Sequence, residues 1–314
     1  MKKQIVRTIV MSAMMTGCVL NMSAQNTLIH EFSLYGGGGF SALNYQLSLG
    51  EGAGGLGGDI GVGYTVYRPT TMVATTGTVS TSRWGMHTGI GLALYNARAR
   101  LHNVNDPVIT GNLLDNDVYG SFKGDPFHMN TNIKKYEEAQ NAMYLNIPVT
   151  VVYQTLNGNR GYYGMGGLKF GVPISGKFKS EDATFLNKGY YYELGNWAEV
   201  QEFAGFGTFA ERNSKGNIDL NFCLMFTLEG GYKWRITSKM YLYAGVYFDY
   251  GLTNASKGKY QAFLNYDQTK PKDFTTNSVL TSYRDSLEST KFTEKFNPIA
   301  IGIKLRIAFE GWLL

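Results

Sequence analysis

The stretch DLNFCLMFTLEGGYKWR, residues 219–235, is followed after the turn ITSK by MYLYAGVYFDY, residues 240–250, and together they indicate how the chain is built. In the first arm, apolar or aromatic residues at even positions, from Leu220 to Trp234, alternate with polar residues such as Glu229 and Lys233. Because the side chains of a strand point alternately to opposite faces, each arm has one apolar and one charged face. Both arms exceed the ~5–6 residues of an ordinary strand and match the ~9–11 residues of a tilted membrane strand. The pattern predicts a hairpin of two membrane strands.

The same alternation recurs along the chain. It is found in residues 31–40, 56–67, 84–97, 143–153, 162–178 and 299–309. We therefore predict an all-β, transmembrane, antiparallel up-and-down barrel of eight strands. The connections are short after the second, fourth and sixth strands and long after the others. Bacterial barrels combine short periplasmic turns with long external loops in this way, which places both termini in the periplasm.

Three long regions lack a regular pattern and are expected to form the external loops. They are residues 98–139, 179–216 and 251–295, which are rich in residues that favour turns and irregular structure. Residues 260–266 alternate within the third region and would supply one extra hairpin. A ten-stranded barrel is therefore the alternative to eight strands.

The N-terminus has the features of a secretory signal. Lys2, Lys3 and Arg7 are basic, residues 9–15 are mostly apolar, and Met22-Ser23-Ala24 offers a small-residue cleavage site. We assign residues 1–24 to a signal peptide and residues 25–314 to an outer-membrane β-barrel domain of a Gram-negative bacterium. Lipidation at Cys18, within Met15-Thr16-Gly17-Cys18, is the alternative to cleavage after Ala24.

Composition excludes several classes of protein. The full chain has 29 basic and 24 acidic residues, and without the three basic residues of the signal the excess falls to about two, so nucleic acid is not an expected partner. Cys223 is the one cysteine left after cleavage, which excludes an intramolecular disulfide. No apolar run approaches the ~20 residues of a membrane helix. A chain of this kind crosses a membrane only as a closed barrel, because lipid does not tolerate open sheet edges.

The two faces of the strands suggest two different environments. In a soluble barrel such as a lipocalin the apolar face would point inward. The signal peptide, the long strands and the aromatic residues near the strand ends favour the inverted, membrane arrangement. The expected interfacial girdle beside the short turns consists of Tyr64, Trp84, Tyr153, Tyr162, Tyr232, Trp234 and Tyr241.

In a membrane barrel the polar face lines the lumen, where acidic and basic residues nearly balance. The expected lumen charge network consists of Glu31, Asp59, Lys169, Lys177, Glu229, Lys233, Asp249, Lys304 and Arg306. An eight-stranded barrel is just wide enough for its side chains to fill it, so these charges are expected to pair and to plug the interior.

Particular segments resemble a known family. The strand start Tyr144-Leu145-Asn146-Ile147-Pro148, the alternating strands and a last strand ending at Phe309 are similar to the outer-membrane β-barrel domain family, the OmpA/OmpX-like eight-stranded barrels. The resemblance covers essentially the whole mature chain. It implies that Phe309 is the aromatic signal read by the barrel insertion machinery, although five residues follow it here. The peptidoglycan-binding domain of full OmpA-like proteins has no counterpart after Phe309.

No reaction chemistry is indicated. The glycine-rich residues 50–55 lack the strand-then-helix context of a nucleotide loop and look like a flexible loop tip, and His30, His87, His102 and His128 lack metal-ligand spacing. Ion pairing in the lumen explains Glu229 and Asp59 more simply than acid–base catalysis. We therefore expect no enzyme, no metal and no cofactor.

The expected function is structural or interactive. Loops on a rigid scaffold commonly carry function, and here they would bind an extracellular ligand or a host or matrix component. Candidate contacts in the second long loop are Tyr190-Tyr191-Tyr192, Trp197 and residues 203–209. The other expected partners are outer-membrane lipid and the barrel insertion machinery. The alternative function is a small-pore porin or transporter for small solutes.

Overall fold

A computed structural model describes residues 28–68, 71–75, 78–104, 106–116, 123–199, 202–210 and 213–311. The proposed signal peptide with Cys18 lies outside the described residues. Over these residues the fold is all-β apart from three short 3-10 helices. No helix in these ranges has the length and hydropathy that a membrane crossing requires.

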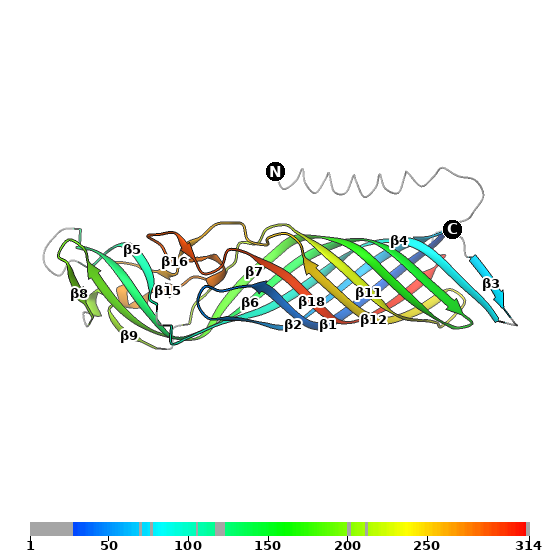
Figure 1. The fold of residues 1–314 in the computed structure, drawn as a ribbon, viewed down its shortest axis with the longest axis horizontal. Helices are drawn as coiled ribbons and strands as arrows, with labels where there is room; N and C mark the ends of the chain where they lie inside the picture. Colours follow the sequence, from blue (N-terminus) through cyan, green and yellow to red (C-terminus); the bar gives the residue numbers. More distant parts are fainter. Residues whose placement is uncertain are drawn as a thin grey trace.

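A large antiparallel sheet closes on itself in a ring of eight strands (Figure 1). In chain order the ring strands are β1 (Ile29–Tyr45), β2 (Glu51–Tyr67), β4 (Thr78–His102), β6 (Pro126–Asn157), β7 (Arg160–Tyr191), β11 (Cys223–Arg235), β12 (Met240–Gly251) and β18 (Phe296–Glu310). Each strand pairs with its neighbours in this order, and β18 pairs with β1 to close the ring. The all-β class and the ring follow from the long alternating segments.

Glycine permits close strand contact where the ring closes. Gly39 of β1 lies opposite Gly302 of β18, and a Cβ atom at Gly39 would collide with the backbone of Ile301. This is the close backbone approach for which glycine is selected within strands. The four consecutive glycines at residues 36–39 therefore lie at the seam where β1 and β18 close the ring.

Several expected loops are strand instead. β1 and β2 are connected by residues 46–50 alone. The prediction of a long loop after the first strand is therefore wrong. The glycine-rich residues 51–55 lie in β2, and only Gly50, with φ +85°, belongs to the turn. The irregularity expected over residues 98–139 and 179–216 is also wrong in part. β4 continues to His102, and β6 and β7 are each 32 residues long.

The extra length of β4, β6 and β7 builds a second region, which we call the head, at the end of the ring opposite the turn between β6 and β7 (Figure 1). Short strands and turns complete it. They are β5 (Val108–Leu114), β8 (Asn196–Ala198), η1 (Glu202–Ala204), β9 (Gly207–Phe209), β10 (Lys215–Asn217), β13 (Gln261–Ala262), β14 (Leu264–Asn265), η2 (Pro271–Asp273), β15 (Thr275–Thr276), η3 (Val279–Thr281), β16 (Ser282–Asp285) and β17 (Thr290–Lys291). At the other end, β3 (Thr71–Thr75) pairs with β4. Residues 260–266 form β13 and β14, which pair with β16 and β15 and add nothing to the ring.

The head has its own apolar core, drawn from all three of the expected loop regions. Phe127 of β6 packs edge to face against Phe206, with ring centroids 5.2 Å apart, and Phe185 of β7 packs against Phe263, 6.1 Å away. All four rings are fully buried. The head is therefore a packed unit, since aromatic burial of this kind dominates core energetics.

Candidate functional site

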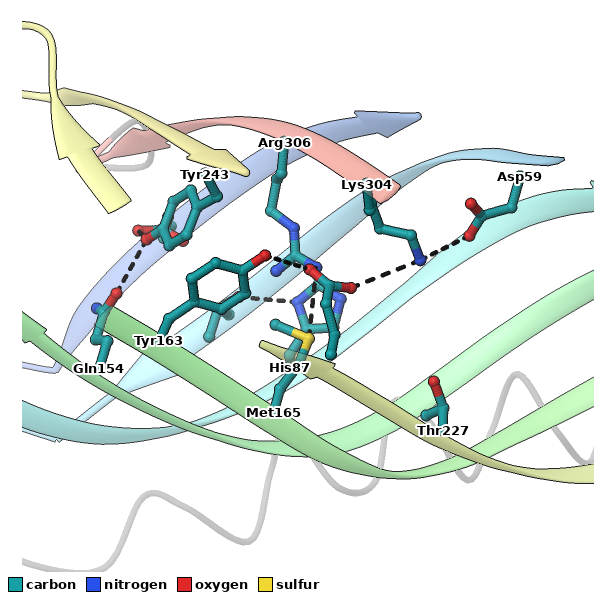
Figure 2. Close-up of polar contacts among 12 residues, drawn as sticks. Asp59, His87, Gln154, Tyr163, Met165, Thr227, Tyr243, Lys304 and Arg306 are labelled. Carbon is teal, nitrogen blue, oxygen red and sulfur yellow. Dashed lines mark hydrogen bonds and ion pairs between the residues drawn. The ribbon is translucent and has the colours of Figure 1, made fainter. Parts of the chain in front are cut away.

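The middle of the ring interior holds a buried cluster of charges. Arg306 donates to Glu229 Oε1 at 2.7 Å, and the Lys304 ammonium lies 3.5 Å from Glu229 Oε2. Lys304 also pairs with Asp59 at 2.7 Å, and the Tyr163 hydroxyl donates to Glu229 at 3.0 Å. Figure 2 shows Lys304 and Arg306 side by side on β18, with Asp59 reached by Lys304. One carboxylate with two cations and a hydroxyl is well compensated for its burial.

A second cluster lies nearer the head. Lys169 of β7 places its ammonium 2.6 Å from one oxygen of Asp249 and 2.7 Å from the other. The Thr227 hydroxyl donates to the same carboxylate at 2.6 Å. These three residues come from three neighbouring strands, β7, β11 and β12, and they are all buried. The cluster joins those strands inside the ring.

A third cluster lies nearer the short-turn end. Glu31 accepts a hydrogen bond from the Tyr243 hydroxyl at 2.8 Å, and the Lys233 ammonium lies 3.7 Å away. Lys233 also donates to Gln154 at 2.9 Å. Arg83 lies 3.8 Å from Glu31 and donates to Glu310 at 2.8 Å. Every charge in the cluster has at least one opposite charge or hydrogen-bond partner.

The structure brings eight of the nine expected lumen charges inside the ring: Glu31, Asp59, Lys169, Glu229, Lys233, Asp249, Lys304 and Arg306. The prediction that Lys177 lies in the lumen is wrong, because this residue is exposed on the outer surface. A register shift places Met143 opposite Ser175 but Tyr144 opposite Pro173, so β7 has an extra residue between them. A bulge of this kind reverses which face the following side chains occupy.

Sequence reasoning missed other members of the network. Arg83 precedes the expected start of its strand by one residue, and its odd number places it on the same face as His87. Extending the alternation by one step would have found it. His87 hydrogen-bonds Thr65 at 2.9 Å in the buried interior. Gln154 and Tyr243 follow the inward parity of their strands but were assigned no partner.

Six of the seven expected girdle residues lie on the outer face, near the short-turn end: Tyr64, Trp84, Tyr153, Tyr162, Tyr232 and Trp234. Trp84 packs against Tyr153 with centroids 4.6 Å apart, and Tyr162 packs against Tyr232 at 4.8 Å. The prediction that Tyr241 belongs to the girdle is wrong. Tyr241 is only 3% exposed and points inward, where the Lys233 ammonium lies 3.7 Å from its ring centroid. Its odd position puts it on the face of Tyr243, not on the outer face. Phe309, the expected insertion signal, is half-buried opposite Phe32 and Met240.

The tip of the head presents an aromatic surface, which we call the distal aromatic cluster. It consists of His128 of β6, Tyr190 of β7, Tyr192 in the turn that follows β7, and Trp197 of β8. His128 stacks on Tyr192 with centroids 4.6 Å apart, and Tyr190 lies 4.9 Å from Trp197. Tyr192 is 42% and Trp197 54% exposed. β8 lies at the end of the molecule farthest from the short turns (Figure 1).

The structure divides the candidate loop contacts into two groups. Tyr190, Tyr192 and Trp197 belong to the distal aromatic cluster, whereas Tyr191 and Phe206 are buried in the head core. Tyr191 donates its hydroxyl to Asp115 at 2.8 Å, and burial raises the pKa of this tyrosine. Alternation along β7 explains the division, because neighbouring tyrosines point to opposite faces.

The buried carboxylate of Glu138 connects two segments of the head by hydrogen bonds. Glu138 of β6 accepts hydrogen bonds from Tyr136, Gln140, Ser278 and the backbone N–H of Val279, at 2.7, 2.9, 2.5 and 3.1 Å. Burial raises the pKa of the Glu138 carboxyl above its usual value, and these donors only partly oppose that shift. The carboxylate thereby ties η3 to β6.

Within the described ranges, no group of three or more His, Cys, Asp or Glu side chains could hold a metal ion. Comparison of the sequence with protein-family models and with curated proteins finds no match.

Proposed function

We propose that the chain is an outer-membrane β-barrel protein with a filled lumen, which displays the head outside the cell as an interaction surface. The observation that carries this proposal is the inverted distribution of polarity in the ring. Its interior holds the paired charges, while its outer face exposes residues such as Leu34, Ile60 and Ile303. A continuous apolar exterior of this extent marks contact with lipid or with another protein.

The height of the apolar face supports lipid as the surroundings. The outward residues of β18 are apolar from Ile299 to Phe309. About ten residue steps at ~3.3 Å, with a tilt of ~40°, give a height of ~25 Å. Outer-membrane barrels have an apolar band of ~25 Å with aromatic girdles at its edges. The outward aromatic residues near the short turns, such as Trp84 and Tyr153, lie where one girdle belongs.

The packed interior favours an anchor over a pore. Charges paired inside the ring, such as Glu229 and Lys304, are buried, and so are the tyrosines among them, including Tyr35, Tyr163 and Tyr243. We expect the protein reconstituted in planar bilayers to show no stable open state. A reproducible conductance of defined size would overturn the filled lumen and favour the small-pore alternative.

The position of the head supports an interaction role. Tyr and Trp are enriched at binding hot spots, and the distal aromatic cluster holds such rings at the point farthest from the proposed membrane. Candidate ligands are extracellular, including a host or matrix component.

Epitope insertion tests the membrane arrangement. An epitope placed at Gly195, in the exposed turn before β8, should be labelled on intact cells. An epitope at Thr237-Ser238, in the turn between β11 and β12, should be labelled only after the outer membrane is permeabilised. Equal labelling of both sites on intact cells would contradict the proposal. Recovery of the protein in the soluble fraction instead of the membrane fraction would also contradict it.

Adhesion tests the interaction role. Cells that carry the protein should be retained on surfaces coated with mucin or collagen, and Tyr192→Ala/Trp197→Ala should reduce this retention severalfold. Glu193→Gln/Lys188→Gln on the same hairpin, at one exposed and one half-buried position, serves as the control with intact rings. Retention that does not depend on the two rings would rule out the distal aromatic cluster as the contact surface.

A further inference from the structure

A groove of about 880 Å³ lies where the ring meets the head. One side is formed by Tyr250 of β12, Asn297 of β18 and Asn44 of β1, on three neighbouring strands. Asn44 lies directly opposite Asn297 in the pairing of β1 with β18. The other side is residues 289–295, a segment that includes β17. A volume of this size is within the range of ligand-binding pockets.

Hydrogen bonds hold the second side of the groove in place. The backbone N–H of Ser48 donates to the Phe292 carbonyl at 2.7 Å, and the Ser48 hydroxyl donates to the Lys291 carbonyl at 3.3 Å. The Tyr260 hydroxyl donates to the Thr293 carbonyl at 3.2 Å. The segment is thus tied both to the turn between β1 and β2 and to the rest of the head, and the groove is preformed.

The groove lies directly beyond the apolar outer face of the ring. On β18, Asn297 precedes Ile299 by two residues and lies on the same face, at a distance of ~6–7 Å along the strand. On β12, the Tyr250 ring stacks on Phe248 with centroids 6.5 Å apart, so an apolar surface continues into the groove. If lipid surrounds the ring, this is the level of the lipid headgroups at the head side of the membrane.

The charged residues that line the groove are Lys291, Glu294 and Lys295. Glu294 has 80% of its side chain exposed and approaches Lys291 at 3.3 Å. A surface ion pair of this kind is worth little, so an anion in the groove can replace it. Lys295 is exposed. Two ammonium groups against one outward carboxylate leave a net positive lining, which favours an anion.

We propose that this groove binds the phosphate-bearing headgroup of a membrane lipid. Lys291 and Lys295 contact the phosphate, and the acyl chains of the lipid lie on the outward faces of β12 and β18. The position beside the apolar band selects an amphiphile over a soluble anion. This inference rests on the proposed membrane function and names a specific lipid contact for it.

Native mass spectrometry of the full chain tests the site. The protein is reconstituted in phosphatidylcholine nanodiscs that contain phosphatidylglycerol as a minor component, then released in mild detergent. We expect one retained phosphatidylglycerol, and a decrease of at least about tenfold in its retention for Lys291→Gln/Lys295→Gln, because two charge-assisted contacts are lost. Lys295→Gln alone, at an exposed position where folding is not at risk, should show a smaller decrease.

The matched control is Lys179→Gln/Lys215→Gln. These two lysines are exposed, face each other across β7 and β10, and do not line the groove. They remove the same charge, so an equal decrease in the control would overturn the site. Equal retention of phosphatidylcholine, or displacement of the lipid by inorganic phosphate, would also overturn it. Failure of the protein to enter nanodiscs would instead overturn the proposed membrane function, whereas insertion without lysine-dependent retention would overturn the groove alone.

Discussion

Strands β4, β6 and β7 run through both the ring and the head, and their inward side chains change character on the way. On β6 the inward residues in the ring include Asn146, Thr150 and Gln154, whereas Phe127 and Met129 point inward in the head. The outer surfaces change in the opposite sense. The apolar face of the ring gives way in the head to a surface that carries exposed ion pairs such as Lys188 with Glu199.

This difference shows that the interior alone does not identify the surroundings of a β-sheet. The head has the arrangement expected in water, with an apolar core and a polar surface. The ring has an interior stabilised by ion pairs and hydrogen bonds, and apolar residues outside. The boundary between the two lies near Ile299 and Tyr250, which is where the proposed membrane would end.

The largest effect is expected from Glu229→Gln. It leaves Arg306 and Lys304 without their shared buried carboxylate, so we expect a loss of roughly 3–5 kcal/mol in the free energy of unfolding. Urea unfolding of the vesicle-inserted protein measures it. The control is Glu199→Gln in the head, which breaks the exposed pair with Lys188 at a similar distance of 2.8 Å. It should cost below about 1 kcal/mol. Equal losses would remove the distinction between buried and exposed charges.

Phe206→Ala tests whether the head unfolds separately from the ring. It opens a cavity beside Phe127 and Tyr191 and should cost the head about 3–5 kcal/mol. Hydrogen exchange should rise at head amides such as that of Asn187, while amides of β12 and β18 stay protected. Uniform loss of protection in both regions would show that they form a single cooperative unit.

Ile303→Arg tests the surroundings of the ring directly. Ile303 is 65% exposed near the middle of the apolar face, and Leu194, at 67%, is the matched position in the head. In lipid, an arginine at the midplane costs about 2–4 kcal/mol, while Leu194→Arg should change stability by less than about 0.5 kcal/mol. Similar small effects at both positions would argue that water surrounds the ring as well.

Glu138→Gln tests the hydrogen bonds that fasten the head. The two oxygens of Glu138 accept hydrogen bonds from the hydroxyls of Ser278 and Tyr136, one each. Glutamine replaces one of these oxygens with an NH2 group, which cannot accept, so one of the two hydrogen bonds is lost. We expect the head to lose about 1–3 kcal/mol near neutral pH, with the ring unchanged. Chemical denaturation followed by a probe in the head measures the loss. An unchanged midpoint would show that η3 does not depend on this carboxylate.

The smallest expected effect is a pH dependence of the head from the same residue. Burial raises the folded-state pKa of Glu138, so its contribution to stability is greatest below the unfolded pKa. That contribution falls as the pH rises through the folded pKa. The difference in stability between wild type and Glu138→Gln should therefore change over this window. A constant difference from acidic to neutral pH would exclude titration of Glu138.

The site residues could be predicted from the sequence in those strands where the alternation is unbroken. In β11, β12 and β18 a single period-two pattern runs from end to end, and Glu229, Asp249, Lys304 and Arg306 all point inward as their parity predicts. In β6 and β7 the pairing shifts register between Ile133 and Lys135, Glu137 and Glu138, and Met143 and Tyr144. Each shift reverses the parity, which made the extended strands look irregular and misplaced Lys177.

The sequence by itself determined the strands of the ring, because alternation over ten or more residues requires an extended strand with two unlike faces. Where no bulge interrupts the alternation, it also determined which residues share a face, since the side-chain period of a strand is two. Only the tertiary structure decided which carboxylate meets which cation, as these pairs join strands far apart in the sequence. It likewise decided that the expected loops fold into a head, because the core of Phe127, Phe185, Phe206 and Phe263 is assembled from separate segments whose contacts no local pattern records.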